Sequence, residues 1–282
     1  MTTIGVVGGG VLGKAIARGF MEHAEVRVFD VIEERSTCRT LAEVATCDFV
    51  FICLPTPALP DGRCDTLAID DFLRTAKHDG HWTCESCYVI RSTVPVGYTQ
   101  RQAELRSLDL PLLHSPEFLT ARCSLTDFQC PARNIVGVPS LGFDLPAMNW
   151  WKSAEERLTR LYVERFPGVP VLDMHSNASE LVKLACNSFF AAKVTLFNLF
   201  YDAAKAAGVS WEDVRNGILS DGRIAHAHTA VPGPSGELGF GGACLPKDVL
   251  NLHMSCCELD VDSAILSAVL ERNEKTREHM TL

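Results

Sequence analysis

A run of glycines directly after the first apolar segment is the strongest constraint on how this chain can fold. Thr3–Val7 has the β-branched composition of a buried strand, and Gly8-Gly9-Gly10-Val11-Leu12-Gly13 follows it without a break. This G-x-G-x-x-G spacing allows a tight turn, and it lets backbone N–H groups at the start of a helix approach a pyrophosphate. A glycine run alone is weak evidence, so its surroundings decide what it indicates.

The residues that follow have the spacing of a dinucleotide-binding unit. A helix is expected over Leu12–Glu22 and a second strand over Val26–Phe29, and this strand leads into Asp30. An acid about 20 residues after the glycines can bind a ribose 2′-hydroxyl, and it would repel the extra phosphate of NADP. The pattern therefore predicts NAD as the cofactor. The alternative is a plain strand-to-helix turn followed by a solvated aspartate.

The apolar pattern changes part-way along the chain. In residues 1–175, short runs rich in Val, Ile and Phe alternate with helical stretches, as in a doubly wound parallel sheet. Beyond them only helices are expected. We therefore predict an α/β, Rossmann-like domain over residues 1–175 and an all-helical dimerisation and catalytic domain over residues 176–282. Further strands are expected over Phe49–Leu54, Tyr88–Arg91, Leu110–Leu113, Asn134–Val138 and Val169–Leu172, and further helices over Leu67–Lys77, Thr99–Leu108, Trp150–Phe166, Asn177–Ala207, Trp211–Leu219 and Ser263–Met280.

Composition excludes several functions. Among 282 residues, 35 are acidic and 26 basic, so the net charge is −9, which disfavours nucleic acid and anionic membranes as partners. Charged and amide side chains interrupt the most apolar stretch, Leu181–Ala207, which indicates a buried or interface helix and no membrane span. Its apolar face is longer than one small domain needs, which predicts a homodimer. Twelve cysteines without a secretory signal predict reduced thiols in the cytoplasm.

The second chemical motif is a glycine-rich loop that carries a cysteine. In Gly-Phe-Gly-Gly-Ala-Cys-Leu-Pro-Lys-Asp, residues 239–248, Cys244 stands at an expected helix start and Lys247 lies three residues on. A helix N-terminus and a nearby cation both stabilise a thiolate, the nucleophilic form of cysteine. Cys244 is therefore a candidate nucleophile. The alternative, which holds for any of the twelve cysteines, is a buried structural thiol.

A third group of polar residues lies on the long expected helix. Glu180, Lys183 and Asn187 are three and four residues apart, so they share one face. Polar groups on an otherwise apolar helix need partners or a wet cavity, and a lysine there can stabilise negative charge on a substrate oxygen. A helix cap and a solvated edge would also explain Glu180, but they explain Asn187 less easily.

One further cluster contains zinc-ligand residue types. His78, His81, Cys84 and Cys87 recur every three residues. A structural zinc site normally has two ligand pairs separated by a longer loop, which is missing here. We therefore expect a surface turn before the Tyr88 strand and no metal.

Together these motifs resemble the UDP-glucose/GDP-mannose dehydrogenase family. The similarity follows the family's order along essentially the whole chain, and the Gly-Phe-Gly-Gly-x-Cys-x-Pro-Lys-Asp element is its most specific part. The resemblance implies a four-electron, NAD-dependent oxidation of a nucleotide-sugar C6 alcohol to the uronate, of the UDP-glucose 6-dehydrogenase type used in polysaccharide biosynthesis. The segments that carry it are Gly8–Gly13 with Asp30, Cys53–Pro57, Ser92–Gly97, Ser115–Leu119, the helix with Lys183 and Asn187, and the Cys244 loop.

The resemblance also implies roles for single residues. Cys244 would trap the intermediate aldehyde as a thiohemiacetal, which a second oxidation turns into a thioester. Lys183 would stabilise the oxyanion and Asn187 would orient the reacting group. Asp248 and Thr93 would hold a proton-shuttling water, and Glu117 would serve thioester hydrolysis. The implied cofactor contacts are Gly8, Gly10, Val11, Leu12, Gly13, Asp30, Arg35, Leu54, Pro55, Thr56, Ser92, Thr93 and Lys247, and the implied substrate contacts are Phe118, Leu119, Lys183, Asn187, Arg223 (often from the partner subunit), Phe240 and Gly241.

Two departures from the family pattern keep alternatives open. Ala121 and Arg122 stand where an acid and a glycine are usual, and the chain ends at Leu282, where a C-terminal UDP-binding domain normally follows. We therefore expect a short form of the enzyme, which is either minimal in itself or completed by a partner chain, or which takes a substrate smaller than a nucleotide sugar. A two-domain β-hydroxyacid dehydrogenase also combines a glycine turn with a helix lysine and asparagine, but it transfers one hydride and needs no cysteine. A non-catalytic NAD-binding protein is the other alternative, and the complete set of reactive residues argues against it.

Overall fold

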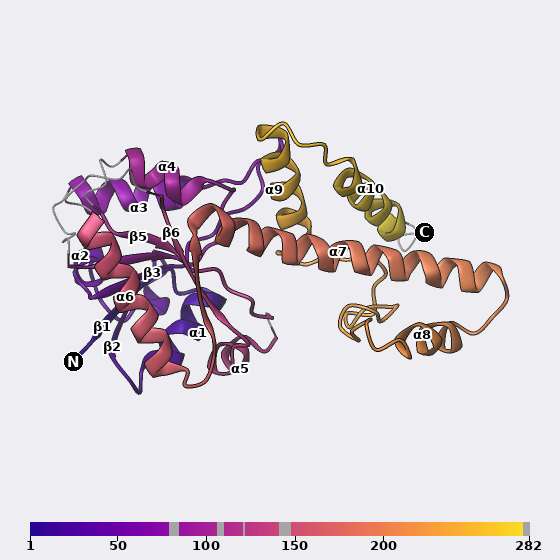
Figure 1. Ribbon diagram of the computed structural model, residues 1–282, viewed down its shortest axis with the longest axis horizontal. Coiled ribbons are helices and arrows are strands. Elements are labelled where there is room, and N and C mark those ends of the chain that lie inside the picture. The colour runs from indigo at the N-terminus through magenta and orange to yellow at the C-terminus, as the bar shows by residue number, and fades with distance from the viewer. Residues whose placement is uncertain (79–84, 106–109, 121, 141–147, 279–282) are drawn as a thin grey trace. The chain divides into compact units, whose positions relative to one another are not determined.

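The computed structural model describes residues 1–78, 85–105, 110–120, 122–140 and 148–278 (Figure 1). The chain forms two compact units. Unit 1 comprises Met1–Pro57 and Cys64–Lys183, and unit 2 comprises Ala58–Arg63 and Leu184–Leu282. One long helix therefore begins in unit 1 and continues into unit 2.

Unit 1 is built on a seven-stranded sheet with the order β2-β1-β3-β4-β5-β6-β7 (Figure 1). Neighbouring strands are parallel, except that β5 and β6 are antiparallel. The predicted α/β class is confirmed, and each expected strand overlaps an observed one. The strands are β1 (Thr3–Val7), β2 (Glu25–Phe29), β3 (Phe49–Ile52), β4 (Cys87–Ile90), β5 (Leu112–His114), β6 (Asn134–Val138) and β7 (Val171–His175).

The helices of unit 1 bury the apolar sheet. All residues of β3 and β4 are buried, as strands covered on both faces should be. Phe20 of α1 meets Phe128 of α5 and Phe166 edge-on, with ring centroids 5.6 and 6.3 Å away. Both α2 and α5 were missing from the sequence-based expectation. The helices are α1 (Val11–Phe20), α2 (Leu41–Ala45), α3 (Leu67–His78), α4 (Tyr98–Leu105), α5 (Ser124–Gln129) and α6 (Met148–Arg165), with a 3-10 turn over Glu33–Arg35.

In its described residues, unit 2 consists of helices and the loops that join them. The long helix α7 (Ser176–Ala206) is shifted by one residue at each end from the predicted Asn177–Ala207. It is followed by α8 (Trp211–Leu219), α9 (Leu245–Glu258) and α10 (Ala264–Glu278). Their small apolar core contains Ala191, Phe240, Val249 and Val269. No helix in the described part of the chain is long and apolar enough to cross a bilayer.

Of the four candidate zinc ligands, His81 and Cys84 lie outside the described residues. His78 ends α3, while Cys87 is buried in β4, where its thiol donates to the carbonyl of Ala154. The described residues contain no group of three or more side chains arranged to hold a metal ion. Nor does a disulfide join any two described cysteines.

Candidate functional site

The glycine turn after β1 is shaped by close backbone packing. Gly8 has φ +100°, and a Cβ there would lie 2.5 Å from the carbonyl oxygen of Cys53. A Cβ on Gly13 would collide with the carbonyl of Gly8, whereas nothing lies within 4 Å of a Cβ on Gly10. The first and last glycines are thus required by the chain itself, and the middle one leaves open space before the first turn of α1. This is the arrangement that lets a pyrophosphate approach the helix N-terminus.

Asp30 follows β2 and supports the same turn. Its carboxylate accepts hydrogen bonds from the backbone N–H of Gly9 (2.6 Å) and of Ile32 (2.8 Å). The backbone carbonyl of Arg35 also lies beside Gly9, while the Arg35 side chain lines a groove with Lys14 and Arg18. The carboxylate therefore stands at the turn, where the sequence predicted a ribose-binding acid.

The loops after β3 and β4 are joined by side-chain hydrogen bonds. Ser92 donates to the carbonyl of Leu54 (2.7 Å), and Thr56 donates to the carbonyl of Thr93 (2.7 Å). The strand order reverses between β1 and β3, and open α/β sheets bind ligands at the carboxyl ends of the strands at such a point. Because the glycine turn follows β1, the predicted cofactor contacts of unit 1 gather at this edge. Backbone donors, open space at Gly10 and a carboxylate after β2 fit the pyrophosphate and ribose of NAD.

A buried ion pair follows β5. Lys183 of α7 contacts the Glu117 carboxylate at 2.8 Å, and the side chains are 5% and 16% exposed. Burial alone would raise the pKa of Glu117, but Lys183 and the N–H of Leu119 hold this pKa below its usual range. Lys183 and Arg133 also lie over the ring of Phe118, at 5.7 and 4.0 Å from its centroid. Glu117 is therefore a carboxylate at neutral pH.

Two buried groups close to this ion pair were not predicted from the sequence. Arg91 follows β4, is 6% exposed and donates to the hydroxyls of Ser115 (2.7 Å) and Tyr162 (3.3 Å). His114 contacts Ser179 at 2.6 Å through Nδ1, and burial together with the charges of Arg91 and Lys183 lowers its pKa to about 3. Arg91 and His114 each lie at the end of a strand that leads into a predicted site loop. The sequence has no signal that these two side chains are buried.

In unit 2, Cys244 is the N-cap residue of α9 and is exposed. Asp248, one turn later, is 1% exposed and receives two partners. The ammonium of Lys247 lies 2.5 Å from one carboxylate oxygen, and the amide of Asn187 donates to the other at 2.5 Å. Three predicted site residues therefore form one polar cluster beside the first turn that follows Cys244.

Two asparagines hold the loop that precedes Cys244. The backbone N–H and carbonyl of Phe240 bond the Asn273 side chain at 2.7 and 2.9 Å, and the N–H of Gly239 donates to Asn198 at 3.0 Å. Gly239 has φ +71°. Neither asparagine was predicted from the sequence to hold this loop. The only signal for them in the sequence was a polar residue at a helix position that is expected to be buried.

One predicted substrate contact lies at the surface. Arg223, in the loop after α8, is exposed and paired with Asp221 at 2.5 Å. Of the two positions that depart from the family pattern, Arg122 is exposed and Ala121 lies outside the described residues.

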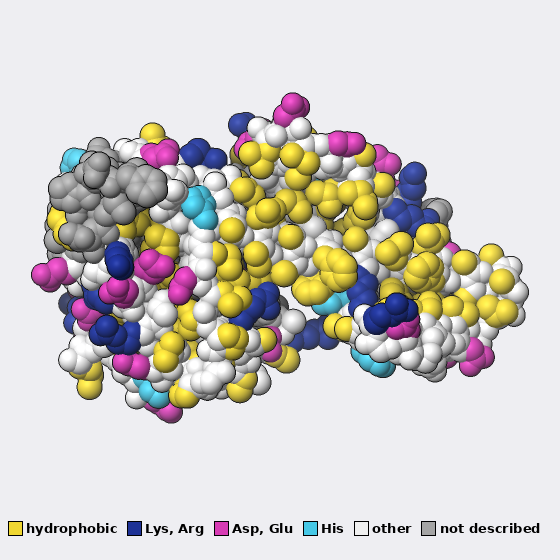
Figure 2. Space-filling model, in the orientation of Figure 1, with side chains coloured by type: hydrophobic (Ala, Val, Ile, Leu, Met, Phe, Trp, Pro, Cys, Tyr) yellow, Lys and Arg dark blue, Asp and Glu magenta, His cyan; other side chains and the backbone are white. Residues whose placement is uncertain are grey.

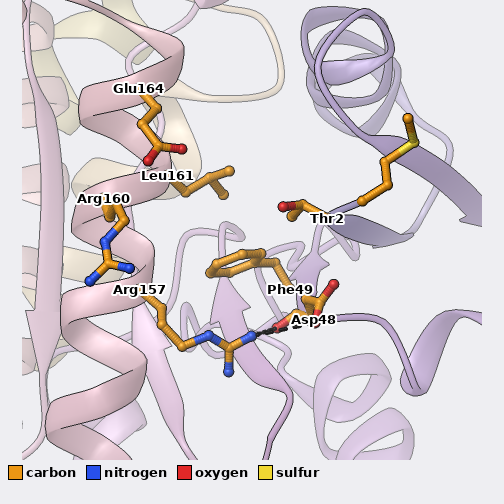
Figure 3. Close-up of a pocket in the computed structure, with 8 residues that line it drawn as sticks. Thr2, Asp48, Phe49, Arg157, Arg160, Leu161 and Glu164 are labelled. Atoms are coloured by element: carbon orange, nitrogen blue, oxygen red, sulfur yellow. Dashed lines mark hydrogen bonds and ion pairs between the residues drawn. The ribbon is translucent and has the colours of Figure 1, made fainter.

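A separate pocket of about 380 Å³ lies at the opposite edge of the sheet (Figure 3). Asp48 and Phe49, where β3 begins, face Arg157 of α6, whose guanidinium lies 3.6 Å from Asp48 and 5.2 Å from the centroid of the Phe49 ring. The glycine turn and the loop with Thr56 follow the carboxyl ends of the strands, whereas this pocket lies where β1 and β3 begin. It therefore contains none of the predicted site residues.

Two segments of the chain match one known family. Residues 33–143 match the NAD binding domain of the UDP-glucose/GDP-mannose dehydrogenase family, and residues 177–275 match its central domain. The chain belongs to the UDP-glucose/GDP-mannose dehydrogenase family. It therefore contains the family's NAD-binding domain, in agreement with the cofactor predicted from the glycine turn and Asp30.

Relatives within the family share its sequence and fold. UDP-glucose 6-dehydrogenase of Pseudomonas aeruginosa is 34% identical over 251 residues, 85% of this chain and 51% of that protein. The Rickettsia felis enzyme of the same name is 30% identical over 244 residues, 84% and 50% respectively. A UDP-glucose dehydrogenase structure from Pyrobaculum islandicum superposes with a TM-score of 0.79 at 27% identity, covering 98% of this chain and 68% of that one. This chain thus spans about half the length of the curated relatives it matches.

A fourth comparison concerns the fold alone. A 3-hydroxyisobutyrate dehydrogenase structure from Mycobacterium tuberculosis superposes with a TM-score of 0.74 at 18% identity, covering 98% of this chain and 93% of that one. The order of a sheet unit followed by a long-helix unit is therefore shared beyond the family.

Proposed function

We propose that this chain catalyses the NAD-dependent, four-electron oxidation of a nucleotide-sugar C6 alcohol to the uronate. The observation that carries the proposal is that both family domains are matched and that each of the two compact units holds a formed polar cluster. One cluster is the Lys183–Glu117 ion pair of unit 1. The other is Asp248 with Asn187 and Lys247 in unit 2, next to the exposed Cys244.

The residues at the carboxyl edge of the sheet would hold the cofactor. First-turn N–H groups after Gly10 would bind the pyrophosphate, and Asp30 would bind the adenosine ribose. The loops that Ser92 and Thr56 tie together would lie along the rest of the molecule. When bound, NAD supplies the hydride acceptor for both oxidations.

Cys244 would be the nucleophile. Its sulfur forms a bond to the carbon of the aldehyde produced by the first oxidation, and the aldehyde oxygen takes up the thiol proton, which gives a thiohemiacetal. Loss of a hydride and of the hydroxyl proton then gives a thioester. Water adds to it and the carbon–sulfur bond breaks, so the thiol is restored and the carboxylate is released.

The two polar clusters would serve the proton and charge changes in these steps. Ionised Glu117 can accept a proton from the attacking water, and the ammonium of Lys183 can stabilise an oxyanion. Asn187 and Asp248 hold each other in a fixed orientation and would orient the reacting group. Thr93 would complete the set by binding a water beside the cofactor.

We further propose that the protein works as a cytoplasmic homodimer. Hydrophobic side chains gather along the course of α7 (Figure 2). On α7, Phe189, Leu196 and Leu199 are 65%, 50% and 48% exposed, at the spacing of one helix face. A second copy of this chain would cover that face by the same residues, as a twofold interface requires. The reduced state of the described cysteines supports a cytoplasmic location.

The test measures NADH formation at 340 nm with UDP-glucose, GDP-mannose and N-acetylated UDP-sugars. We expect two NADH per sugar, and loss of turnover in Cys244→Ala. Cys257→Ala, a change at another exposed cysteine of α9, is the matched control and should keep full activity. One NADH per substrate with an active Cys244→Ala protein would instead indicate a β-hydroxyacid dehydrogenase. Binding of NAD without turnover of any substrate would favour a non-catalytic NAD-binding protein.

A further inference from the structure

Glu180 is a buried carboxylate of α7 to which the proposed reaction assigns no role. It is 1% exposed and lies one turn before Lys183. One carboxylate oxygen accepts from the N–H of Gly97 (2.6 Å), and the other accepts from the N–H (2.8 Å) and hydroxyl (2.6 Å) of Thr99. Three donors from a segment some 80 residues away therefore converge on a single side chain.

These donors belong to the start of α4. Gly97 precedes the first helical residue, Tyr98, and Thr99 is the second, so their N–H groups have no partners within the helix. Glu180 thus caps α4 from a different element, in the position that the helix dipole favours for a negative charge. Gly97 has φ +85°, a conformation that turns the chain into this helix.

The segment before α4 contains Ser92 and Thr93. Its first residues are fixed to the loop after β3 through Ser92 and Leu54, and through Thr56 and Thr93. Its last residue, Gly97, is fixed by Glu180. The Thr93 segment is therefore held at both ends, and α7 supplies one of the two attachments.

The same helix turn carries Lys183, whose ammonium pairs with Glu117 at 2.8 Å. Ser179, beside Glu180, is itself held by His114 at 2.6 Å. Because an α-helix is rigid over one turn, any shift of Glu180 relative to Gly97 also shifts Lys183 relative to Thr93. The contact of Glu180 with Gly97 therefore also fixes the position of Lys183 relative to Thr93.

We propose that Glu180 is a positioning residue that locks the Thr93 segment to α7, so that Thr93 and Lys183 keep the relative position that turnover needs. This inference rests on the proposed function for its effect on rate, but its structural part stands without it. Among the described residues, the charge of Arg101 of α4 acts on Glu180, and Lys183 lies one turn further along α7. Burial raises the pKa of Glu180 to about 7, against the three hydrogen bonds and Arg101, which lower it. Protonation would replace one acceptor site with a donor, and the cap would be weakened.

The test compares the full-length chain with Glu180→Gln, which keeps the shape and resembles the protonated form. At about pH 8 we expect kcat to fall about tenfold while the Kd for NAD changes by less than about threefold, because orientation is lost and the glycine turn is untouched. The wild-type rate should also fall as the pH drops through about 7, and this limb should be absent in the variant. Glu104→Gln, an exposed change on α4, is the control and should match wild type. A variant with unchanged kcat and an unchanged pH profile overturns the proposal.

Two further measurements separate this inference from the proposed function. Thr99→Val removes only the hydroxyl donor and should give a smaller loss of kcat, with no added loss when combined with Glu180→Gln. Amide hydrogen exchange at Gly97 and Thr99 needs no turnover. We expect faster exchange there in Glu180→Gln, even if wild type oxidises no sugar nucleotide, and unchanged exchange would contradict the lock.

Discussion

Gly13 and Gly10 lie in the same turn but tolerate a side chain very differently. A Cβ on Gly13 would overlap the carbonyl of Gly8, whereas Gly10 has open space. We expect Gly13→Ala to destabilise the protein by about 1–3 kcal/mol through overpacking, and to weaken NAD binding because the turn must move. Gly10→Ala should leave the free energy of unfolding nearly unchanged. Chemical denaturation and NAD titration of both variants would test this, and equal stability of the two would contradict it.

The free energy of unfolding should depend on pH because of Glu180. Its pKa is about 7 in the folded chain against a usual 4.5, mainly because it is buried. Between these two values the folded state binds more protons than the unfolded state, so stability falls as the pH rises. Relative to Glu180→Gln, wild type should lose about 3 kcal/mol between about pH 5 and pH 8. Parallel pH dependences in urea denaturation of the two proteins would rule this out.

The loss of stability on ionisation of Glu180 links the stability of the fold to the proposed function at one residue. The three donors of α4 favour the ionised carboxylate of Glu180, whereas burial favours its protonated form. Buried charges that destabilise a fold are retained where a site needs them. The helical spacing predicted that Glu180, Lys183 and Asn187 share a face, and it left a helix cap and a solvated edge as explanations of Glu180. Its actual partners could not be read from the sequence, because they come from a loop about 80 residues earlier.

At the scale of elements, α10 holds the glycine-rich loop that precedes Cys244 through Asn273 and through the Arg277–Glu237 ion pair. Asn273 is 9% exposed and makes two hydrogen bonds to the backbone of Phe240. Asn273→Ala leaves both backbone groups without this partner, so we expect a loss of about 1–3 kcal/mol and faster hydrogen exchange at Phe240. Glu274→Ala, at the exposed neighbouring position, is the control. Exchange at Phe240 that is equal in the two variants would show that the loop is held by other contacts.

The elements themselves were largely predictable because their patterns are strong. The apolar runs of β1 and β6 and the long periodic pattern of α7 matched the observed bounds closely. The short helix α2 was missed although Thr40 and Glu43 form a capping box, a signal that the sequence does contain. The antiparallel pairing of β5 with β6 could not be predicted, since a short buried strand has the same apolar pattern in either direction. The roles of Cys244 and Glu117 stay predictions, because contacts alone do not show chemistry.

At the scale of the molecule, α7 exposes apolar side chains along one face. Phe189, Leu196 and Ala203 repeat every seven residues, and Leu199 lies three after Leu196. This four–three spacing is the one by which two helices pack along a shared seam. An apolar groove of about 520 Å³ between α7 and α8, lined by Ala207 and its neighbours, adjoins the seam. Apolar surface of this extent on a helix favours burial against a protein partner.

Charge introduced into the seam should therefore separate the two copies. We expect wild type to scatter light as a dimer at micromolar concentration and the double variant Phe189→Glu, Leu196→Glu to scatter as a monomer, because carboxylates at the seam would repel across the twofold axis and would have to be desolvated. Lys205→Glu changes an exposed position on the other side of α7 and should remain dimeric. The side chains of Phe189 and Leu196 are 65% and 50% exposed. The monomeric double variant should therefore keep its fold and its circular dichroism spectrum. A wild-type protein that scatters light as a monomer at micromolar concentration would contradict the homodimer.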